Sequence, residues 1–299
     1  LRIESLNARV GLPDLWLKWE APNPTGSFKD RLHAVSMSVG RRLGFRDAAI
    51  VTTGNSGAAA AAYAARNGLR LRAWVHPDTP RECVWRMRAL GARVEVAGEG
   101  VSAEVDALVR ERGHYPCTLL GTCWGAANPY GVEGYKTIAH EVSGQLGRVP
   151  DRFCAPVSGG DALYGPWRGF VERRALGLSD AVPRMVSCQS EAADFVARTY
   201  REGLSAMAVV EPRTVALSIG DPTGSECIRR AIDGSGGEAW LASEAQIEAA
   251  QGWLAQVGIL AEAASATPVA ALARAVREGR VSRDEVVVAL VTAAGKKIG

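Results

Sequence analysis

The sequence lacks long apolar runs. No stretch of about 18 apolar residues, the length that a membrane-spanning helix needs, is without a charge or a helix breaker. The first residues also lack the basic-then-apolar pattern of a secretory signal. We therefore expect a protein without a membrane partner that works in the cytoplasm.

Neither basic nor acidic residues are in large excess. The 35 basic residues are spread along the chain among 32 acidic ones, which gives a formal net charge of +3. Because no basic tail or stripe is present, nucleic acid is not an expected partner.

Cysteine is scarce, and its spacing is not that of a metal site. The six cysteines form no C-x-x-C pair, and none has a histidine at metal-binding spacing, so no metal ligands are predicted. Reduced, buried thiols are the favoured interpretation. These residues are Cys83, Cys117, Cys123, Cys154, Cys188 and Cys227.

With these classes excluded, we expect a globular protein with a large core. The 299 residues exceed one ordinary domain of about 100 to 200 residues. Extended apolar segments alternate with segments of helical spacing, which predicts parallel βαβ units. The predicted strands are 15–19, 48–52, 71–76, 93–97, 152–157, 184–189 and 286–291, the last a central strand because it is apolar throughout. The predicted helices include 57–67, 81–90, 102–112, 134–146 and 268–277.

Lys29 is the most informative single residue. It stands in Asn-Pro-Thr-Gly-Ser-Phe-Lys-Asp-Arg (residues 23–31), just past a Pro/Gly turn where a helix should begin. The positive end of a helix dipole disfavours the ammonium form of a lysine and favours a neutral, nucleophilic amine. Such an amine can form a Schiff base with an aldehyde cofactor and later move a proton at the substrate carbon.

Two further loops follow apolar strands. Thr53, Gly54, Asn55 and Ser56 lie where a strand turns into an Ala-rich helix, so their N–H groups and hydroxyls suit the carboxylate of an amino acid, or simply cap the helix. The second loop has small residues that let backbone amides approach a phosphate closely. It consists of Ser158, Gly159, Gly160, Asp161 and Ala162.

These motifs together resemble those of threonine synthases, within the tryptophan-synthase-β superfamily of fold-type II pyridoxal-phosphate enzymes. The likeness extends through Trp167-Arg168-Gly169-Phe170 and the terminal Leu290-Val291-Thr292 and covers almost the whole chain. It implies that Lys29 carries pyridoxal 5'-phosphate. It also implies that Asn55 contacts the phenolic oxygen of the cofactor, that residues 158–162 bind its phosphate, and that Thr292 contacts its pyridine nitrogen. Thr53, Gly54 and Ser56 would then bind the amino-acid substrate.

The resemblance also implies an architecture. We expect an α/β fold with two lobes, each a mostly parallel sheet flanked by helices, and the cofactor in the cleft. The expected limits are 1–32 with 147–299 for the large cofactor-binding domain and 33–146 for the small domain. A homodimer is expected as well.

The implied reaction is that of a pyridoxal-phosphate carbon–oxygen lyase. A threonine synthase eliminates phosphate from the γ-carbon of O-phosphohomoserine and adds water at the β-carbon, which is the leading prediction. Two departures weaken it: Leu32 where the family has glycine, and Gly131 where it often has arginine. Asp161 departs from the pattern of the phosphate loop, and because a carboxylate would be repelled by a phosphate, we expect it to face outward. The alternative is a threonine or serine dehydratase, or a β-replacement enzyme of the cysteine synthase type. A non-catalytic homologue that keeps the fold is a third possibility.

Overall fold

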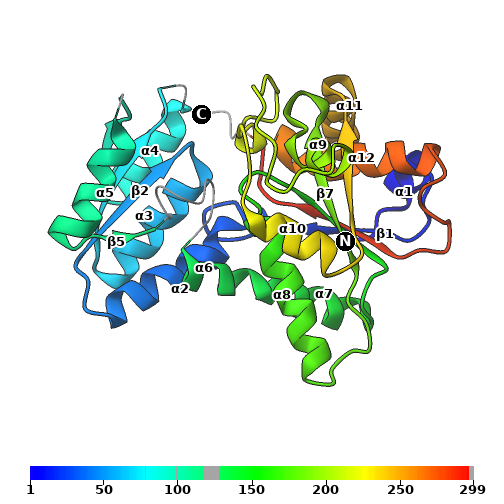
Figure 1. Cartoon of the computed structure of the whole chain (residues 1–299), viewed down its shortest axis with the longest axis horizontal. Coiled ribbons are helices and arrows are strands. Elements are labelled where there is room, and N and C mark those ends of the chain that lie inside the picture. Colours follow the sequence, from blue (N-terminus) through cyan, green and yellow to red (C-terminus); the bar gives the residue numbers. More distant parts are fainter. Residues whose placement is uncertain (78, 99, 118–127, 296–299) are drawn as a thin grey trace. The chain divides into compact units, whose positions relative to one another are not determined.

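The computed structural model describes residues 1–77, 79–98, 100–117 and 128–295 (Figure 1). Its contacts divide the chain into two compact units. The smaller unit is Pro22–Gly134, and the larger one combines Leu1–Ala21 with the described residues from 135 to 295.

A four-stranded parallel sheet in the order β4-β3-β2-β5 forms the centre of the smaller unit. Its strands are β2 (Asp47–Thr52), β3 (Arg70–Val75), β4 (Arg93–Val96) and β5 (Tyr115–Pro116). The helices are α2 (Lys29–Arg42), α3 (Asn55–Asn67), α4 (Arg81–Ala89), α5 (Val101–Arg112) and α6 (Pro129–Val132). One apolar cluster joins the sheet to α2, α3 and α4, and a second, around Trp74, joins it to α5.

A five-stranded sheet in the order β1-β9-β6-β7-β8, also parallel, forms the centre of the larger unit. Its strands are β1 (Leu15–Trp19), β6 (Arg152–Pro156), β7 (Arg184–Ser190), β8 (Glu238–Ala242) and β9 (Val287–Val291). Its α-helices are α1 (Glu4–Val10), α7 (Lys136–Leu146), α8 (Asp161–Ala175), α9 (Phe195–Arg201), α10 (Glu226–Asp233), α11 (Glu244–Gln256) and α12 (Ala263–Arg277). Short 3-10 turns are η2 (Glu191–Ala193) and η3 (Leu217–Ile219), and η1 (Glu133–Tyr135) lies where the chain passes from the smaller unit to the larger one.

Helices cover both faces of this larger sheet. In Figure 1, α11 and α12 lie on one side of the strands and α7, α8 and α10 on the other. Neighbouring residues of β6 face opposite sides: Cys154 belongs to the cluster with α12, whereas the ring of Phe153 packs against Phe170 of α8 with centroids 5.8 Å apart. A strand covered on both faces is apolar at every position, which is why β9 reads as a continuous apolar run.

The α/β class with two parallel sheets flanked by helices is confirmed, and the predicted strands match β1, β2, β3, β4, β6, β7 and β9 within two residues. β9 is a central strand as predicted, since it pairs with β1 and β6. Of the cysteines, Cys117, Cys154 and Cys188 are buried, Cys83 and Cys227 are half-buried, and Cys123 lies outside the described residues.

The predicted domain limits differ from those of the two compact units. The units change at residues 21/22 and 134/135 rather than at 32 and 147, because α7 packs along α8 of the larger unit. Gly169 of α8 makes this packing possible, since a Cβ there would lie 2.7 Å from the Lys136 carbonyl oxygen. As limits of functional domains, the sequence-based values stay a prediction.

Candidate active site

Lys29 follows a turn at Thr25 that is held by hydrogen bonds to Asp30 and from Arg86. The buried carboxylate of Asp30 accepts hydrogen bonds from the Thr25 N–H (3.0 Å) and the Thr25 hydroxyl (2.9 Å). Arg86 of α4 donates to the Thr25 carbonyl oxygen at 2.8 Å. Asp30 therefore closes the turn back onto the start of α2, and this accounts for the Thr and Asp of the lysine motif.

Lys29 itself is the first residue of α2 and is half-buried. Its Nζ lies 4.7 Å from the centroid of the Phe28 ring. No side chain caps the start of α2, so the amine stands at the positive end of the helix, as the sequence predicted.

The second predicted loop ends β2 and starts α3. Gly54 has a φ of +152°, and its N–H donates to Thr52 Oγ1 at 3.1 Å. The N–H of Gly57 donates to the same oxygen at 3.0 Å. Thr52, which the sequence reasoning missed, therefore shapes the loop from inside. Thr53 is exposed, whereas Asn55 and Ser56 are half-buried at the first two positions of α3.

A histidine links this loop to the lysine helix. His33, one turn after Lys29 on α2, is fully buried, and its Nε2 lies 2.9 Å from Ser56 Oγ. Burial first, and then the charge of Lys29, lower the pKa of His33 to about 3. His33 is therefore neutral at physiological pH. Its spacing of four residues from Lys29 was the signal in the sequence that could have identified it.

Leu32 and Gly131, the two residues of the smaller unit that depart from the family pattern, lie against each other. Leu32 is buried, and a Cβ built on Gly131 would lie 2.9 Å from Leu32 Cγ. Asn128 caps the start of α6 by accepting the N–H groups of Tyr130 (3.0 Å) and Gly131 (3.3 Å). A side chain at residue 131 and the side chain of Leu32 therefore compete for one space.

In the larger unit, the Gly-rich loop lies between β6 and α8. Gly160 has a φ of +108° and precedes α8, whose first turn has no side-chain cap. A Cβ on Gly160 would lie 2.5 Å from Ile228 Cγ1, so only glycine fits here. Ser225 fastens the loop from outside, because its hydroxyl donates to the Gly159 carbonyl oxygen at 2.6 Å.

Two carboxylate side chains are near this loop: Asp221, which contacts it, and Asp161, which belongs to it. The Ser158 hydroxyl donates to Asp221, a residue that the sequence did not point to. Asp161 is the first residue of α8 and is half-buried. Ala162 is buried at the second position. The expected outward orientation of Asp161 stays a prediction.

Thr292 follows β9 directly and is buried. Its Oγ1 lies 2.8 Å from the hydroxyl oxygen of Ser265 on α12, and the same Ser265 oxygen accepts the Ala293 N–H at 2.9 Å. Ser265 thus fixes the chain after β9 and orients Thr292. Ser265 could not be identified from the sequence beyond its place in a segment that resembles the family.

The residues of the two units match the chemistry of pyridoxal phosphate when each is considered by itself. The smaller unit supplies an amine at a helix start, which suits an aldehyde. The larger unit supplies an uncapped helix start behind a loop where a Cβ does not fit, which suits a phosphate, and a hydroxyl, which suits a pyridine nitrogen.

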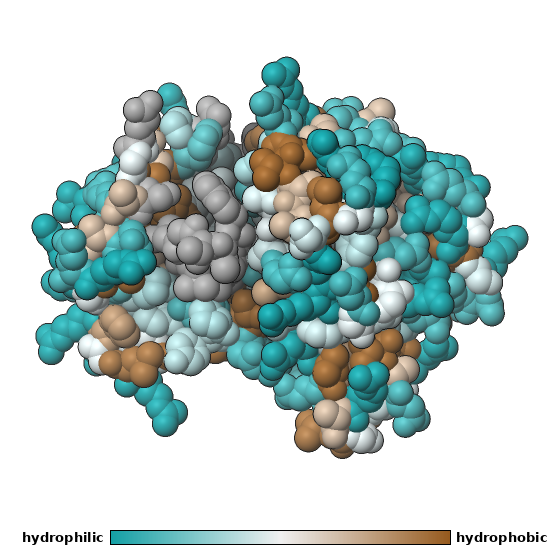
Figure 2. Space-filling model, in the orientation of Figure 1, coloured by the Kyte–Doolittle hydropathy of each residue, from teal (hydrophilic) through white to brown (hydrophobic). Residues whose placement is uncertain are grey.

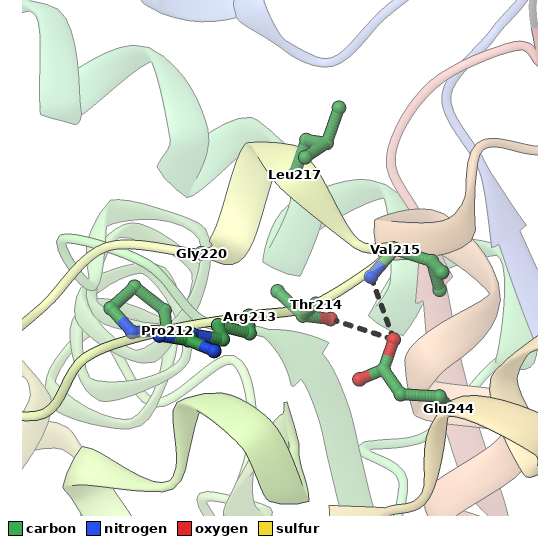
Figure 3. Close-up of a pocket in the computed structure, with 7 residues that line it drawn as sticks. All are labelled: Pro212, Arg213, Thr214, Val215, Leu217, Gly220 and Glu244. Carbon is green, nitrogen blue, oxygen red and sulfur yellow. Dashed lines mark hydrogen bonds between the residues drawn. The ribbon is translucent and has the colours of Figure 1, made fainter.

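A separate pocket of about 430 Å³ lies in the larger unit. Figure 3 shows Glu244, at the start of α11, pointing toward Thr214 and Val215. Its carboxylate accepts the Val215 N–H at 2.6 Å and the Thr214 hydroxyl at 3.2 Å. None of the predicted site residues lines this pocket. The lining residues are Pro212, Arg213, Thr214, Val215, Leu217, Gly220 and Glu244.

The chain belongs to the family of pyridoxal-phosphate dependent enzymes, whose model matches residues 1–293. It is 34% identical over 306 residues to the threonine synthase of Methanocaldococcus jannaschii, covering 99% of this chain and 74% of that protein. It is 35% identical over 298 residues to the threonine synthase of Methanosarcina acetivorans, covering 97% and 72%. The chain is therefore a threonine synthase-like lyase that uses pyridoxal 5'-phosphate.

A solved structure shows the same fold at lower identity. The processed form of threonine deaminase isoform 2 from Solanum lycopersicum superposes with a TM-score of 0.82. The identity is 19%, and the match covers 100% of this chain and 84% of that one.

Two negative findings hold for the described residues. None of their helices has both the length and the apolar character required to cross a bilayer. No group of three or more His, Cys, Asp and Glu side chains among them could hold a metal ion.

Proposed function

We propose that this enzyme eliminates a leaving group from an amino acid in the manner of a threonine synthase, with Lys29 as its catalytic residue. The observation that carries the proposal is the amine of Lys29 at the uncapped start of α2, one turn from His33 and the Ser56 loop. When bound, pyridoxal phosphate serves as an electron sink that makes the Cα–H of an attached amino acid acidic.

The chain's own residues would do the rest. The Lys29 amine would hold the cofactor through its aldehyde, and as a free base it would take the proton from the substrate Cα. The Asn55 amide would donate to the phenolic oxygen, and the Thr292 hydroxyl would contact the pyridine nitrogen. Residues 158–162 would bind the phosphate, while Thr53, Gly54 and Ser56 would bind the substrate carboxylate.

The uncharged side chain of Thr292 affects which type of reaction the enzyme would favour. A neutral hydroxyl stabilises a protonated pyridine less than a carboxylate does, so the ring is a weaker electron sink. Elimination and replacement reactions fit that setting. Water addition at the β-carbon after loss of phosphate would give threonine.

A second candidate is favoured by the contact of Leu32 with Gly131. Where relatives of the threonine synthase type often carry an arginine, this chain has no side chain, and Leu32 fills the space above it. A substrate phosphate would meet an alkyl group there instead of a cation. This favours a dehydratase or a β-replacement enzyme that acts on a substrate without phosphate.

The cofactor assignment is tested by the visible absorption of the purified holoenzyme. The Lys29→Ala variant should lose the band of the lysine-bound cofactor, and Lys18→Ala, a variant of another lysine in the first 30 residues, should keep it. A band that survives in Lys29→Ala would contradict the assignment.

The substrate is tested with a panel of four amino acids: O-phosphohomoserine, threonine, serine and O-acetylserine. Release of phosphate from the first alone supports the threonine synthase reaction. Keto acid from threonine or serine, or a sulfide-dependent product from O-acetylserine, supports the second candidate.

The proposal also covers the oligomeric state of the protein and its location in the cell. We infer a cytoplasmic homodimer. Figure 2 shows apolar side chains at the lower end of the larger unit, where α8 and the turn after it lie. Leu176 and Leu178 are exposed there, and a groove lined by Tyr164, Trp167 and Val171 runs along α8. Sedimentation of the purified protein at several concentrations tests the dimer.

A further inference from the structure

His33 is a buried side chain for which the proposed reaction has no role so far. It is fully buried, it contacts Ser56, and its Nδ1 has no hydrogen-bond partner within the described part of the chain. It joins two segments that are 23 residues apart in sequence, the helix that starts at Lys29 and the loop that starts α3.

The buried Nδ1 decides which ring nitrogen carries the proton. If Nδ1 were protonated, a buried N–H would be left without an acceptor. If Nε2 is protonated, only a lone pair on Nδ1 is left without a donor. Unpartnered buried N–H groups are rarer in proteins than under-satisfied acceptors, so the Nε2–H form is favoured.

The ring nitrogen that carries the proton determines the direction of the Ser56 hydroxyl proton. With the proton on Nε2, His33 donates to Ser56 Oγ at 2.9 Å. The Ser56 proton then points elsewhere and can donate to an anion. With the other form, Ser56 would spend its proton on His33 and could only accept.

We propose that His33 is a positioning residue that donates from Nε2 to Ser56 Oγ and so directs the Ser56 hydroxyl proton toward the carboxylate of the amino-acid substrate. This inference rests on the proposed function, because it assigns the donor of the same substrate loop. His33 and Lys29 share one face of α2 at a spacing of four residues. The contact of His33 with Ser56 therefore also sets the distance of the loop from Lys29.

The ring can donate from Nε2 without carrying a charge. A neutral imidazole one turn from Lys29 adds no second positive charge to the start of α2. Burial keeps His33 uncharged, and the charge of Lys29 acts in the same direction.

The protonation state can be observed directly, because the chain has only four histidines. Two-bond nitrogen–proton correlation spectra of the ¹⁵N-histidine holoenzyme report which ring nitrogen is protonated, and His33→Gln assigns the signal. We expect a neutral ring with its proton on Nε2 across the neutral pH range. A proton on Nδ1, or a charged ring, overturns the proposal.

The effect on the substrate is tested by binding. Titration of the visible spectrum with L-serine, and with ethanolamine as the amine that lacks the carboxylate, separates the two contributions. His33→Phe and Ser56→Ala should each weaken L-serine binding by about tenfold, the loss expected for one hydrogen bond to a charged group, and should leave ethanolamine binding unchanged. The double variant should be no weaker than either single one, because both remove the same donor.

His33→Gln provides the matched control, since its amide can still donate to Ser56 and should restore part of the L-serine affinity. It also keeps the test valid if His33→Phe fails to fold. Equal L-serine affinity of the wild type, His33→Phe and Ser56→Ala would overturn the inference. A wild-type spectrum that responds to no amino acid of the panel would instead contradict the proposed function, and the nitrogen spectra would still decide the protonation of His33.

Discussion

Leu32 and Gly131 illustrate how two departures from a family pattern become one structural feature. In sequence they are 99 residues apart, and each alone is a single odd residue. In the structure, α2 packs against α6, and the Leu32 side chain covers the bare Cα of Gly131. The two substitutions are therefore complementary in volume, as expected for a close-packed interior.

Complementary volumes make a prediction for stability. Gly131→Ala should destabilise the protein by about 1–3 kcal/mol, because its Cβ would lie 2.9 Å from Leu32 Cγ. In a Leu32→Gly background the same change should cost much less. Urea unfolding of the four proteins measures this coupling.

Gly144→Ala is the matched control for that cycle. Gly144 lies in α7, and a Cβ there meets nothing within 4 Å, so alanine should be neutral or stabilising. If Gly131→Ala cost the same with and without the Leu32 side chain, the two residues would not share the space described.

At the scale of elements, Arg152, the first residue of the middle strand β6, joins several segments at one end of the larger sheet. Its buried guanidinium pairs with Glu238 of β8 and with Glu285 before β9, and it donates to the Arg280 carbonyl oxygen at 3.2 Å. Burial disfavours ionisation of Glu238, but hydrogen bonds from Trp240, Arg280 and Arg152 outweigh it and lower the pKa of Glu238 to about 2.

Removing the cation should therefore cost more than losing a surface ion pair. Arg152→Met should lower the free energy of unfolding by about 3 kcal/mol, because Glu238 and Glu285 each lose the buried guanidinium as an ion-pair partner. Arg148→Met, which breaks an exposed pair with Asp151, should cost less than about 1 kcal/mol. Equal losses in the two variants, measured by urea unfolding at neutral pH, would contradict this account.

At the scale of the whole molecule, His33 links stability to pH. The pKa of His33 is about 3 in the folded protein, against an ordinary value of 6.5. Above pH 6.5 both the folded and unfolded states are neutral at this position, so it has no effect. As the pH falls from 6.5 toward 3, only the unfolded state takes up a proton, and the folded state loses stability.

The comparison with His33→Gln isolates this effect. Between pH 7 and pH 5 the wild type should lose about 2 kcal/mol of unfolding free energy relative to the variant, at about 1.4 kcal/mol per pH unit below 6.5. Urea unfolding of both proteins at the two pH values measures it. Parallel losses in both proteins would show that His33 can be protonated in the folded state.

The sequence was sufficient for much of the fold. Continuous apolar runs identified β6 and β9, and Gly-Asn-Ser after β2 correctly placed the start of a helix. It did not predict β5, which has only two residues, or β8, which reads Glu-Ala-Trp-Leu-Ala without a β-branched residue. Elements this short or this mixed are set by pairing with a neighbouring strand rather than by local preference.

The sequence by itself determined the family and the cofactor, because those depend on short contiguous motifs whose residues act on their own chain neighbours. Lys29 as the residue that bonds to the cofactor stays a prediction. Only the tertiary structure decided that His33 meets Ser56, that Leu32 covers Gly131 and that Ser265 holds Thr292. Each of these contacts joins segments that are distant in sequence. Whether two such side chains meet depends on how helices pack on sheets, which no local pattern of residues encodes.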